Sequence, residues 1–225
     1  MGRALDVQLK VIPSSIANPF VRRIHYSGKV VNNSCLHFGA FLDGKLHGVM
    51  SFGPPTDKRK VLGLVQGTPW NRMLELNRMA FDDCLPRNSE SRCISLAMKL
   101  LKKNAPHVKW VLSFADGCQC GDGTIYRASN FILTGIKQNN TLRRTENGEV
   151  IHSITAYHHG TQGDFSKLPK VPGYQLRYIY FIDKKWRKRL TVPEIPFQKI
   201  DEMGAGMYKG QHVTQAERHV DNYSG

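Results

Sequence analysis

The fold class follows from residues 73–115, MLELNRMAFDDCLPRNSESRCISLAMKLLKKNAPHVKWVLSFA. Met73–Phe81 alternates apolar and polar side chains, which is the period of a strand, and 110–115 is a short apolar run typical of a buried strand. Between them, apolar residues recur every three or four positions over 90–104, which predicts an amphipathic helix that ends before Pro106. A strand, a crossover helix and a second strand predict an α/β sheet.

The flanking sequence adds strands on both sides of this unit. Asp43-Gly44 separates two alternating runs and predicts a tight hairpin turn. The expected strands are 5–12, 36–42, 46–52, 131–137, 149–157 and 175–183, the expected helices are 14–26 and 124–130, and 56–72 is a loop with a short helix. We therefore expect one domain over 1–225, built on a mixed central sheet with helices on both faces and followed by a flexible tail after about residue 200.

The charge balance points to a polyanionic partner. The 225 residues include 32 Lys and Arg against 18 Asp and Glu, a net charge of +14, which favours nucleic acid or an anionic membrane surface. Apolar runs such as 176–182 are too short to cross a bilayer, which excludes a membrane-spanning role. The first residues lack an apolar signal core, and five scattered cysteines are typical of reduced thiols, so we expect a cytoplasmic location.

Residues 113–131, SFADGCQCGDGTIYRASNF, leave a strand at Asp116, cross a glycine-rich loop and enter a helix that carries Tyr126. Sites in α/β sheets lie beyond the carboxyl ends of strands, so Asp116 is a candidate general base or metal ligand. The alternative is that Asp116 only caps the turn. Cys118 and Cys120 are spaced C-x-C rather than as a zinc knuckle, which argues against structural zinc.

Two further positions predict anion binding. Arg78 lies among apolar strand residues, so it needs an anionic ligand or an acid of the fold, such as Glu75 or Asp82. Residues 88–91 open the long helix, where free backbone amides attract an anion; the alternative is an ordinary N-cap.

Four residues supply the nitrogen and oxygen donors that iron or another mid-series divalent metal binds, namely His25, Tyr26, Asp116 and Tyr126. Their spacing in the sequence does not show whether they meet. A metal bound by them is therefore one hypothesis for this chain.

Residues 176–192, LRYIYFIDKKWRKRLTV, form a predicted strand that runs into a group of cations around a tryptophan. Cations beside an aromatic ring suit a nucleic-acid backbone with a stacked base. The predicted DNA-binding residues are Lys184, Lys185, Trp186, Arg187, Lys188 and Arg189. The alternatives are a solvated basic face and a homodimer interface.

Four motifs, taken in order, resemble the Mom family, the adenine-modification proteins of bacteriophage Mu and its relatives. They are HYSG at 25–28, SFGPP at 51–55, LELNRMAF at 74–81 and the segment 113–131. The resemblance extends from about His25 to the basic segment. It implies a GNAT-like fold and the conversion of adenine in double-stranded DNA to carbamoylmethyl-adenine, which protects phage DNA from restriction endonucleases.

The resemblance also implies roles for individual residues. The implied catalytic residues are His25, Tyr26, Arg78, Asp116 and Tyr126, with iron held by His25, Asp116 and Tyr126, and Ser91 lies where the GNAT fold binds its cofactor.

One departure concerns the donor of the transferred group. GNAT enzymes bind the pyrophosphate of acetyl-CoA with an R/Q-x-x-G-x-G/A loop, whereas residues 87–92 read RNSESR and contain no glycine. Side chains there would crowd the anion, which argues against acetyl-CoA and leaves the donor open. The sequence favours a DNA-modifying transferase. The alternatives are an acetyl-CoA-dependent N-acetyltransferase of a small amine or protein, and a non-catalytic DNA-binding protein.

Overall fold

The computed structural model describes residues 3–55, 57–214 and 217 and divides the chain into two compact units. The first comprises Met1–Phe114, Gly123–Thr134 and Arg177–Ile195, and the second Ala115–Asp122, Gly135–Leu176 and Pro196–Gly225. The single domain expected from the sequence stays a prediction, because compactness does not decide whether the units fold separately.

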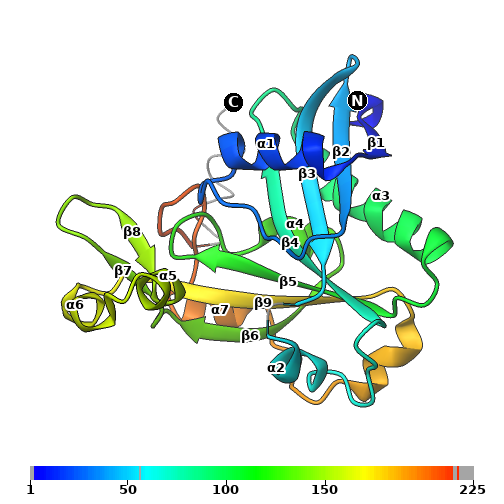
Figure 1. The fold of residues 1–225 in the computed structure, drawn as a ribbon. Coiled ribbons are helices and arrows are strands. Elements are labelled where there is room, and N and C mark those ends of the chain that lie inside the picture. Colours follow the sequence, from blue (N-terminus) through cyan, green and yellow to red (C-terminus); the bar gives the residue numbers. More distant parts are fainter. Residues whose placement is uncertain (1–2, 56, 215–216, 218–225) are drawn as a thin grey trace. The chain divides into compact units, whose positions relative to one another are not determined.

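One seven-stranded sheet runs in the order β1-β2-β3-β4-β5-β9-β6 (Figure 1). The strands are β1 (Gln8–Val11), β2 (Leu36–Leu42), β3 (Lys45–Gly53), β4 (Met73–Phe81), β5 (Trp110–Gly117), β6 (Ile132–Gln138) and β9 (Tyr174–Phe181). The sheet is mixed, because β1 to β4 pair antiparallel whereas β4 and β5 pair parallel. The predicted mixed α/β class is confirmed.

The crossover from β4 to β5 is helix α3 (Ser89–Asn104). Its apolar stripe is buried as predicted, including Cys93, Ala97 and Leu101. The parallel pairing starts with Met73 opposite Trp110 and reaches only to Leu76 opposite Ser113. The candidate site lies on the part of β4 that follows Leu76.

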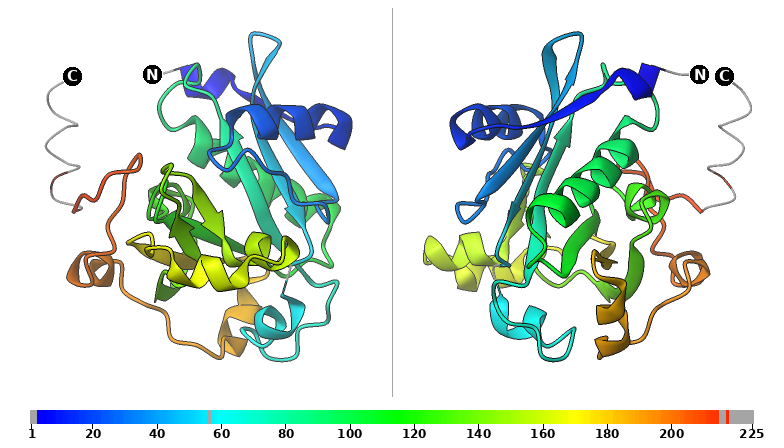
Figure 2. Two further views of the ribbon diagram at one scale, coloured as in Figure 1. Left: turned by 60° about the vertical axis from the view of Figure 1, so that its left-hand side comes forward. Right: turned by 90° about the vertical axis from the view of Figure 1, so that its right-hand side faces the viewer.

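Helices cover both faces of the sheet in the first unit, as predicted. Helix α1 (Ser14–Ile24) buries Ala17 and Phe20 against Val49 of β3 and Ala80 of β4. Figure 2 shows α3 on the opposite face of the same strands. The predicted hairpin between β2 and β3 is also confirmed, because Asp43 and Gly44 have the positive φ angles of 51° and 76° that a tight turn requires.

The prediction of a strand over 149–157 is wrong beyond His152. A short hairpin of β7 (Leu142–Arg144) and β8 (Val150–His152) is followed by helix α5 (Ser153–His158). Residues 139–141 are not in a strand, and the side chain of Asn139 accepts the backbone N–H groups of Thr141 and Leu142. The N–H of Ser153 still donates to the carbonyl of Thr141 over 2.8 Å, and Ser153–His158 then forms a helix despite the strand propensity of its β-branched residues.

Other boundaries differ by a few residues. The first strand starts at Gln8 rather than residue 5, because Arg3–Asp6 forms a 3-10 helix. The short helix expected in 56–72 is α2 (Lys58–Leu62). Helix α4 (Thr124–Ala128) was predicted, whereas α6 (Gln162–Lys167), α7 (Gln198–Glu202) and the 3-10 helix Lys184–Arg189 were not. Residues 215–216 and 218–225 of the expected flexible tail lie outside the described residues.

No helix in the described part of the chain combines the length and the apolar character that crossing a membrane requires.

A substitution at Gly53 can test how tightly β3 packs against the loop that precedes β2. A Cβ at this position would lie 2.4 Å from the carbonyl oxygen of Asn33 and 2.9 Å from the Cα of Ser34. Since both neighbours are backbone atoms, we expect Gly53→Ala to lower the melting temperature by about 4 °C or more. Gly163→Ala is the control, because a Cβ there meets nothing within 4 Å. Equal melting temperatures for both variants, measured by circular dichroism, would contradict the packing described.

Candidate active site

The candidate site is built on an extra residue in β4. Ser51 of β3 lies opposite Arg78, but the next residue, Phe52, lies opposite Leu76. Asn77 is therefore a bulge residue without a partner on β3. A bulge bends the strand and re-aims its side chains, and such irregularities are over-represented next to active sites.

Asn77 is buried but only partly hydrogen-bonded. The residue is 8% exposed, and its Oδ1 accepts the hydroxyl of Ser34 over 2.9 Å. Its buried Nδ2 has no hydrogen-bond partner among the described residues. An unpaired buried donor is uncommon because it forfeits its hydrogen bonds to water. Asn77 is therefore a candidate for hydrogen bonding to a ligand.

Arg78, the next residue, is held by backbone oxygens. Its Nε donates to the carbonyl of Lys29 over 2.8 Å, and its Nη1 donates to the carbonyl of Asn77 over 2.7 Å. Burial lowers the pKa of Arg78, while the nearby Tyr26 and Glu75 raise it. Tyr26 thus lies near enough to Arg78 to affect its pKa, and the two hydrogen bonds fix the plane of the guanidinium.

The motif HYSG forms the turn that carries His25 and Tyr26. Helix α1 ends at Ile24, two residues before the predicted end, because His25 is already extended. The N–H of Gly28 then donates to the carbonyl of His25 over 2.8 Å, and Gly28 has a φ of +61°. Only glycine adopts this left-handed conformation readily, which explains the last residue of the motif.

Hydrogen bonds fix the tautomer of His25. The backbone N–H of Ser27 donates to Nδ1 of His25 over 3.1 Å, and Oγ of Ser27 lies 2.8 Å from the same nitrogen. Because a backbone N–H can only donate, Nδ1 is an acceptor and the neutral ring carries its proton on Nε2. The ring also stacks on Tyr26, with 4.3 Å between centroids.

A buried polar row joins this site across three strands. Nδ1 of His37 in β2 lies 2.8 Å from Oγ of Ser51 in β3, and Ser51 lies opposite Arg78 in β4. Burial lowers the pKa of His37, so its ring is neutral at pH 7. We call His25, Tyr26, His37, Ser51, Asn77 and Arg78 the bulge site. The sequence did not single out His37, Ser51 or Asn77, because their proximity depends on the strand register.

Tyr126 lies in the first unit on α4, where it is buried in an aromatic cluster. Its ring centroid is 5.3 Å from that of Tyr178 and 5.4 Å from that of Phe131. Gly123 precedes α4 with a φ of +88°, and a Cβ there would lie 2.4 Å from the ring of Tyr178. The glycine-rich loop thus allows close packing of Tyr126 against β9.

Ser91 lies in the first turn of α3. Its carbonyl accepts the hydroxyl of Ser129, which follows α4, over 3.3 Å, so the start of α3 and the end of α4 lie together. The N-cap residue of α3 is Asn88, but it has a φ of 69° and its side chain makes no capping hydrogen bond. The expected side-chain cap is therefore not formed by Asn88.

Asp116 belongs to the second unit, where its side chain caps a turn. Its Oδ1 accepts the N–H of Cys118 and its Oδ2 accepts Nε2 of Gln119, both over 3.0 Å. The turn-capping alternative is thus what the structure shows, and a catalytic role for Asp116 stays a prediction.

The basic segment 184–189 is a 3-10 helix that follows β9. Arg187 forms an ion pair with Glu194, and the guanidinium of Arg189 lies 4.4 Å from the centroid of the Trp186 ring. Trp186 also packs against the apolar cluster beneath it. Its ring is therefore covered by protein on two sides. The cations of the segment are all exposed, and of these Arg187 is paired with Glu194.

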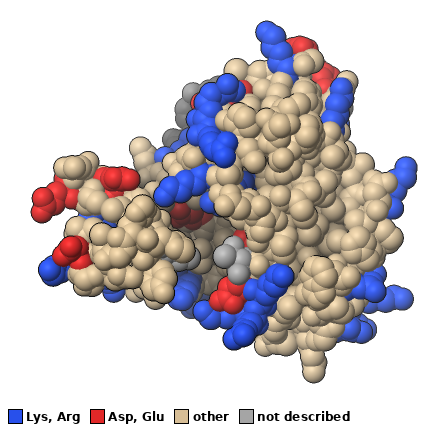
Figure 3. Space-filling model, in the orientation of Figure 1, with Lys and Arg blue, Asp and Glu red and all other residues tan. Residues whose placement is uncertain are grey.

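Two lysines of the basic segment line a pocket with the end of α3. The pocket has a volume of about 570 Å³. We call it the basic pocket; its walls include Lys99, Lys102, Lys109, Tyr180, Lys184 and Lys185. The sequence did not reveal this pocket, because α3 and residue 184 are far apart in the chain. Figure 3 shows further groups of Lys and Arg side chains on one face of the molecule.

Comparison with known proteins places the chain in a family. The family model described as the Mom protein family matches residues 6–199. The chain is 37% identical over 195 residues to the methylcarbamoylase Mom of Escherichia phage Mu, covering 83% of this chain and 80% of that protein. The chain belongs to the Mom protein family.

Solved acetyltransferases resemble this Mom-family chain only distantly. A GNAT-family acetyltransferase from Streptococcus pneumoniae is 9% identical with a TM-score of 0.47, over 78% of this chain and 98% of that one. The spermidine/spermine N-acetyltransferase SpeG from Vibrio cholerae is 8% identical with a TM-score of 0.49, over 83% of this chain and 99% of that one.

The surroundings of the turn at Asp116 predict different reactivities for the thiols of Cys118 and Cys120. Burial, with a smaller contribution from Asp116, raises the pKa of Cys118 to about 12. At pH 7.5 its thiolate fraction is then roughly a thousandfold below that of an ordinary thiol. We expect iodoacetamide to alkylate Cys118 far more slowly than the exposed Cys120. Asp116→Asn should speed the alkylation of Cys118 only slightly, because burial is the larger cause of its raised pKa. Peptide mass spectrometry over time measures both rates, and similar rates for the two cysteines would contradict this picture.

Proposed function

We propose that this chain is a DNA-modifying transferase that converts adenine in DNA to carbamoylmethyl-adenine and so protects that DNA from restriction endonucleases. The observation that carries the proposal is the 37% identity to the methylcarbamoylase Mom over most of both chains. The bulge site supports it, because it offers clustered donors and rings around the part of β4 that follows Leu76. The reaction would take place in the cytoplasm of the host.

The substrate sets two demands on the protein. The exocyclic amine of adenine is conjugated with the ring, so it is a poor nucleophile. It needs a base to take its proton as the new N–C bond forms and the bond between the transferred carbon and the leaving group of the donor breaks. The amine is also stacked inside a duplex, so the base must be flipped out. Asp116 is the predicted general base. That the DNA is double-stranded, and that the chain forms a homodimer, stay predictions.

The bulge site suits the binding of the transferred group. A carbamoylmethyl group carries a carbonyl oxygen, which accepts hydrogen bonds from guanidinium and amide N–H groups. Arg78 has its guanidinium plane fixed by two backbone oxygens, and Nδ2 of Asn77 is an unpaired donor beside it. We infer that Arg78 orients the donor molecule and that Tyr26 and His25 close over it.

That His25, Asp116 and Tyr126 hold iron is also a proposal. The donor types suit iron, which would act as a Lewis acid when bound. The hydrogen bond from Ser27 to Nδ1 leaves the proton of the neutral His25 ring on Nε2, so ligation through Nε2 requires this proton to move. The donor of the group, with acetyl-CoA disfavoured, and a cofactor role for Ser91 stay predictions.

The decisive experiment is nucleoside analysis of DNA from bacteria that express the chain. We expect mass spectrometry to find carbamoylmethyl-deoxyadenosine with the wild type. Arg78→Lys keeps the charge but loses the planar fork, so we expect about a hundredfold less product. Asp116→Asn should abolish the product while DNA binding remains. Arg59→Lys, exposed on α2, is the control and should behave as wild type.

The other outcomes of this experiment separate the alternatives. Acetylated deoxyadenosine would indicate an acetyl-CoA-dependent transferase. Unmodified nucleosides, with folded protein that binds DNA, would indicate a non-catalytic binding protein and would contradict the proposal.

The basic pocket and the lysines of the basic segment are proposed to hold the DNA backbone. Each phosphate contact adds about 0.9 to the slope of log affinity against log salt concentration. The double variant Lys102→Gln, Lys185→Gln should therefore lower this slope by about 1.8 if both lysines contact phosphates. Lys167→Gln is the control, because exposed Lys167 is paired with Asp164. An unchanged slope in the double variant, measured by fluorescence anisotropy, would place the DNA elsewhere.

A further inference from the structure

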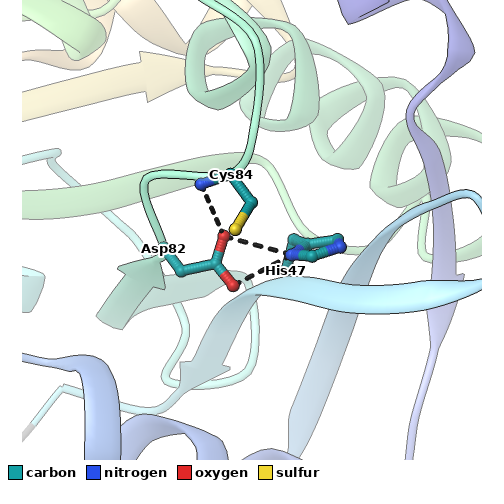
Figure 4. Close-up of side chains that lie close together, drawn as sticks. All are labelled: His47, Asp82 and Cys84. Carbon is teal, nitrogen blue, oxygen red and sulfur yellow. Dashed lines mark hydrogen bonds and ion pairs between the residues drawn. The ribbon is translucent and has the colours of Figure 1, made fainter.

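Three potential metal ligands meet at the opposite end of β3 from Gly53. His47 lies in β3, and Asp82 and Cys84 lie in the turn that follows β4. One ligand atom from each lies within 4.8 Å of the other two. Figure 4 shows the carboxylate of Asp82 between the imidazole of His47 and the sulfur of Cys84. Neither the sequence nor the proposed reaction uses this cluster.

The backbone holds the three residues in place. The N–H of Asp82 donates to the carbonyl of His47 over 2.9 Å, which continues the pairing of β3 and β4. Nδ1 of His47 lies 2.9 Å from Oδ2 and 3.2 Å from Oδ1 of Asp82, and the N–H of Cys84 donates to Oδ1 over 3.0 Å. Asp82 therefore pairs with His47, and the sequence-based alternative that it neutralises Arg78 is not what the structure shows.

We propose that His47, Asp82 and Cys84 bind a zinc-class divalent cation. An imidazole nitrogen, a carboxylate oxygen and a thiolate sulfur are the three ligand types that zinc takes, and a thiolate disfavours magnesium and calcium. Zinc bonds of about 2.0–2.3 Å separate tetrahedral ligands by roughly 3.3–3.8 Å. The cluster reaches this spacing by small side-chain rotations as the metal displaces the proton between His47 and Asp82. Three protein ligands leave the fourth position to water.

A second turn of the same chain shows what the histidine adds. Asp116 accepts the N–H of Cys118 just as Asp82 accepts that of Cys84, so both turns have the local form Asp-x-Cys. His47 lies beside the turn that contains Asp82 and Cys84. Cys84 is exposed, whereas Cys118 is partly buried. A hydrogen-bonded turn alone therefore explains Asp82 and the backbone of Cys84, but not the histidine and the accessible sulfur beside the carboxylate.

The test uses cobalt as a spectroscopic probe of the full-length protein after removal of metals with a chelator. We expect Co²⁺ to bind with a thiolate-to-cobalt absorption band in the near ultraviolet, which Zn²⁺ then abolishes. Cys84→Ser should lose the band, and His47→Gln should weaken binding by roughly tenfold or more. Cys118→Ser is the matched control and should keep the band, because its turn lacks a histidine.

Each outcome decides the question. Absence of the band in the wild type, or its retention in Cys84→Ser of unchanged circular dichroism, would overturn the proposal. Cobalt bound by His25, Asp116 and Tyr126 would give a spectrum that has no thiolate band and that Cys84→Ser leaves unchanged. The two metal hypotheses are therefore distinguishable. A zinc-dependent rise in melting temperature in the wild type but not in Cys84→Ser would support the site independently of any DNA modification.

Discussion

The pairing of β3 with β4 is the constraint on which the candidate site depends. It shifts register between Ser51 and Phe52, so β4 carries Asn77 as an extra residue. The loop after α1 meets this bulge through Ser34, which donates to Asn77, and through the carbonyl of Lys29, which accepts from Arg78. Strand register, loop position and guanidinium orientation are thus one coupled arrangement, and the motifs HYSG and LELNRMAF meet because of it.

Periodicity and turn chemistry were enough to predict most of the first unit. The crossover helix, the Asp43-Gly44 hairpin and the alternating strands depend on local patterns, and local patterns are visible in a single sequence. The bulge is different, because an extra residue is defined only against a partner strand. His37 and Ser51 escaped notice for this reason, although Arg78, which lies in the same row, was identified by its apolar neighbours.

The error at 153–157 has the same physical origin. The β-branched residues there have strand propensity, but a strand also needs a neighbour with free backbone groups. The residues before β7, 139–141, are not in a strand, and Asn139 accepts the N–H groups of Thr141 and Leu142 there. The secondary structure of 153–157 thus depends on a segment about fifteen positions away, which a local pattern does not reveal. Likewise, the basic pocket could not be predicted from α3 alone, because β9 and the basic segment supply its other walls.

The two Asp-x-Cys turns show that the same local motif can have different chemistry in different surroundings. In both, an aspartate accepts the N–H of the cysteine two residues later. Burial beside Asp116 raises the pKa of Cys118 to about 12 and keeps its thiol protonated. Cys84 is exposed, and the carboxylate before it is already shared with an imidazole. A bound cation would take this carboxylate as a ligand together with the sulfur. His47, contributed by the neighbouring strand, therefore decides which of the two turns is suited to bind a metal.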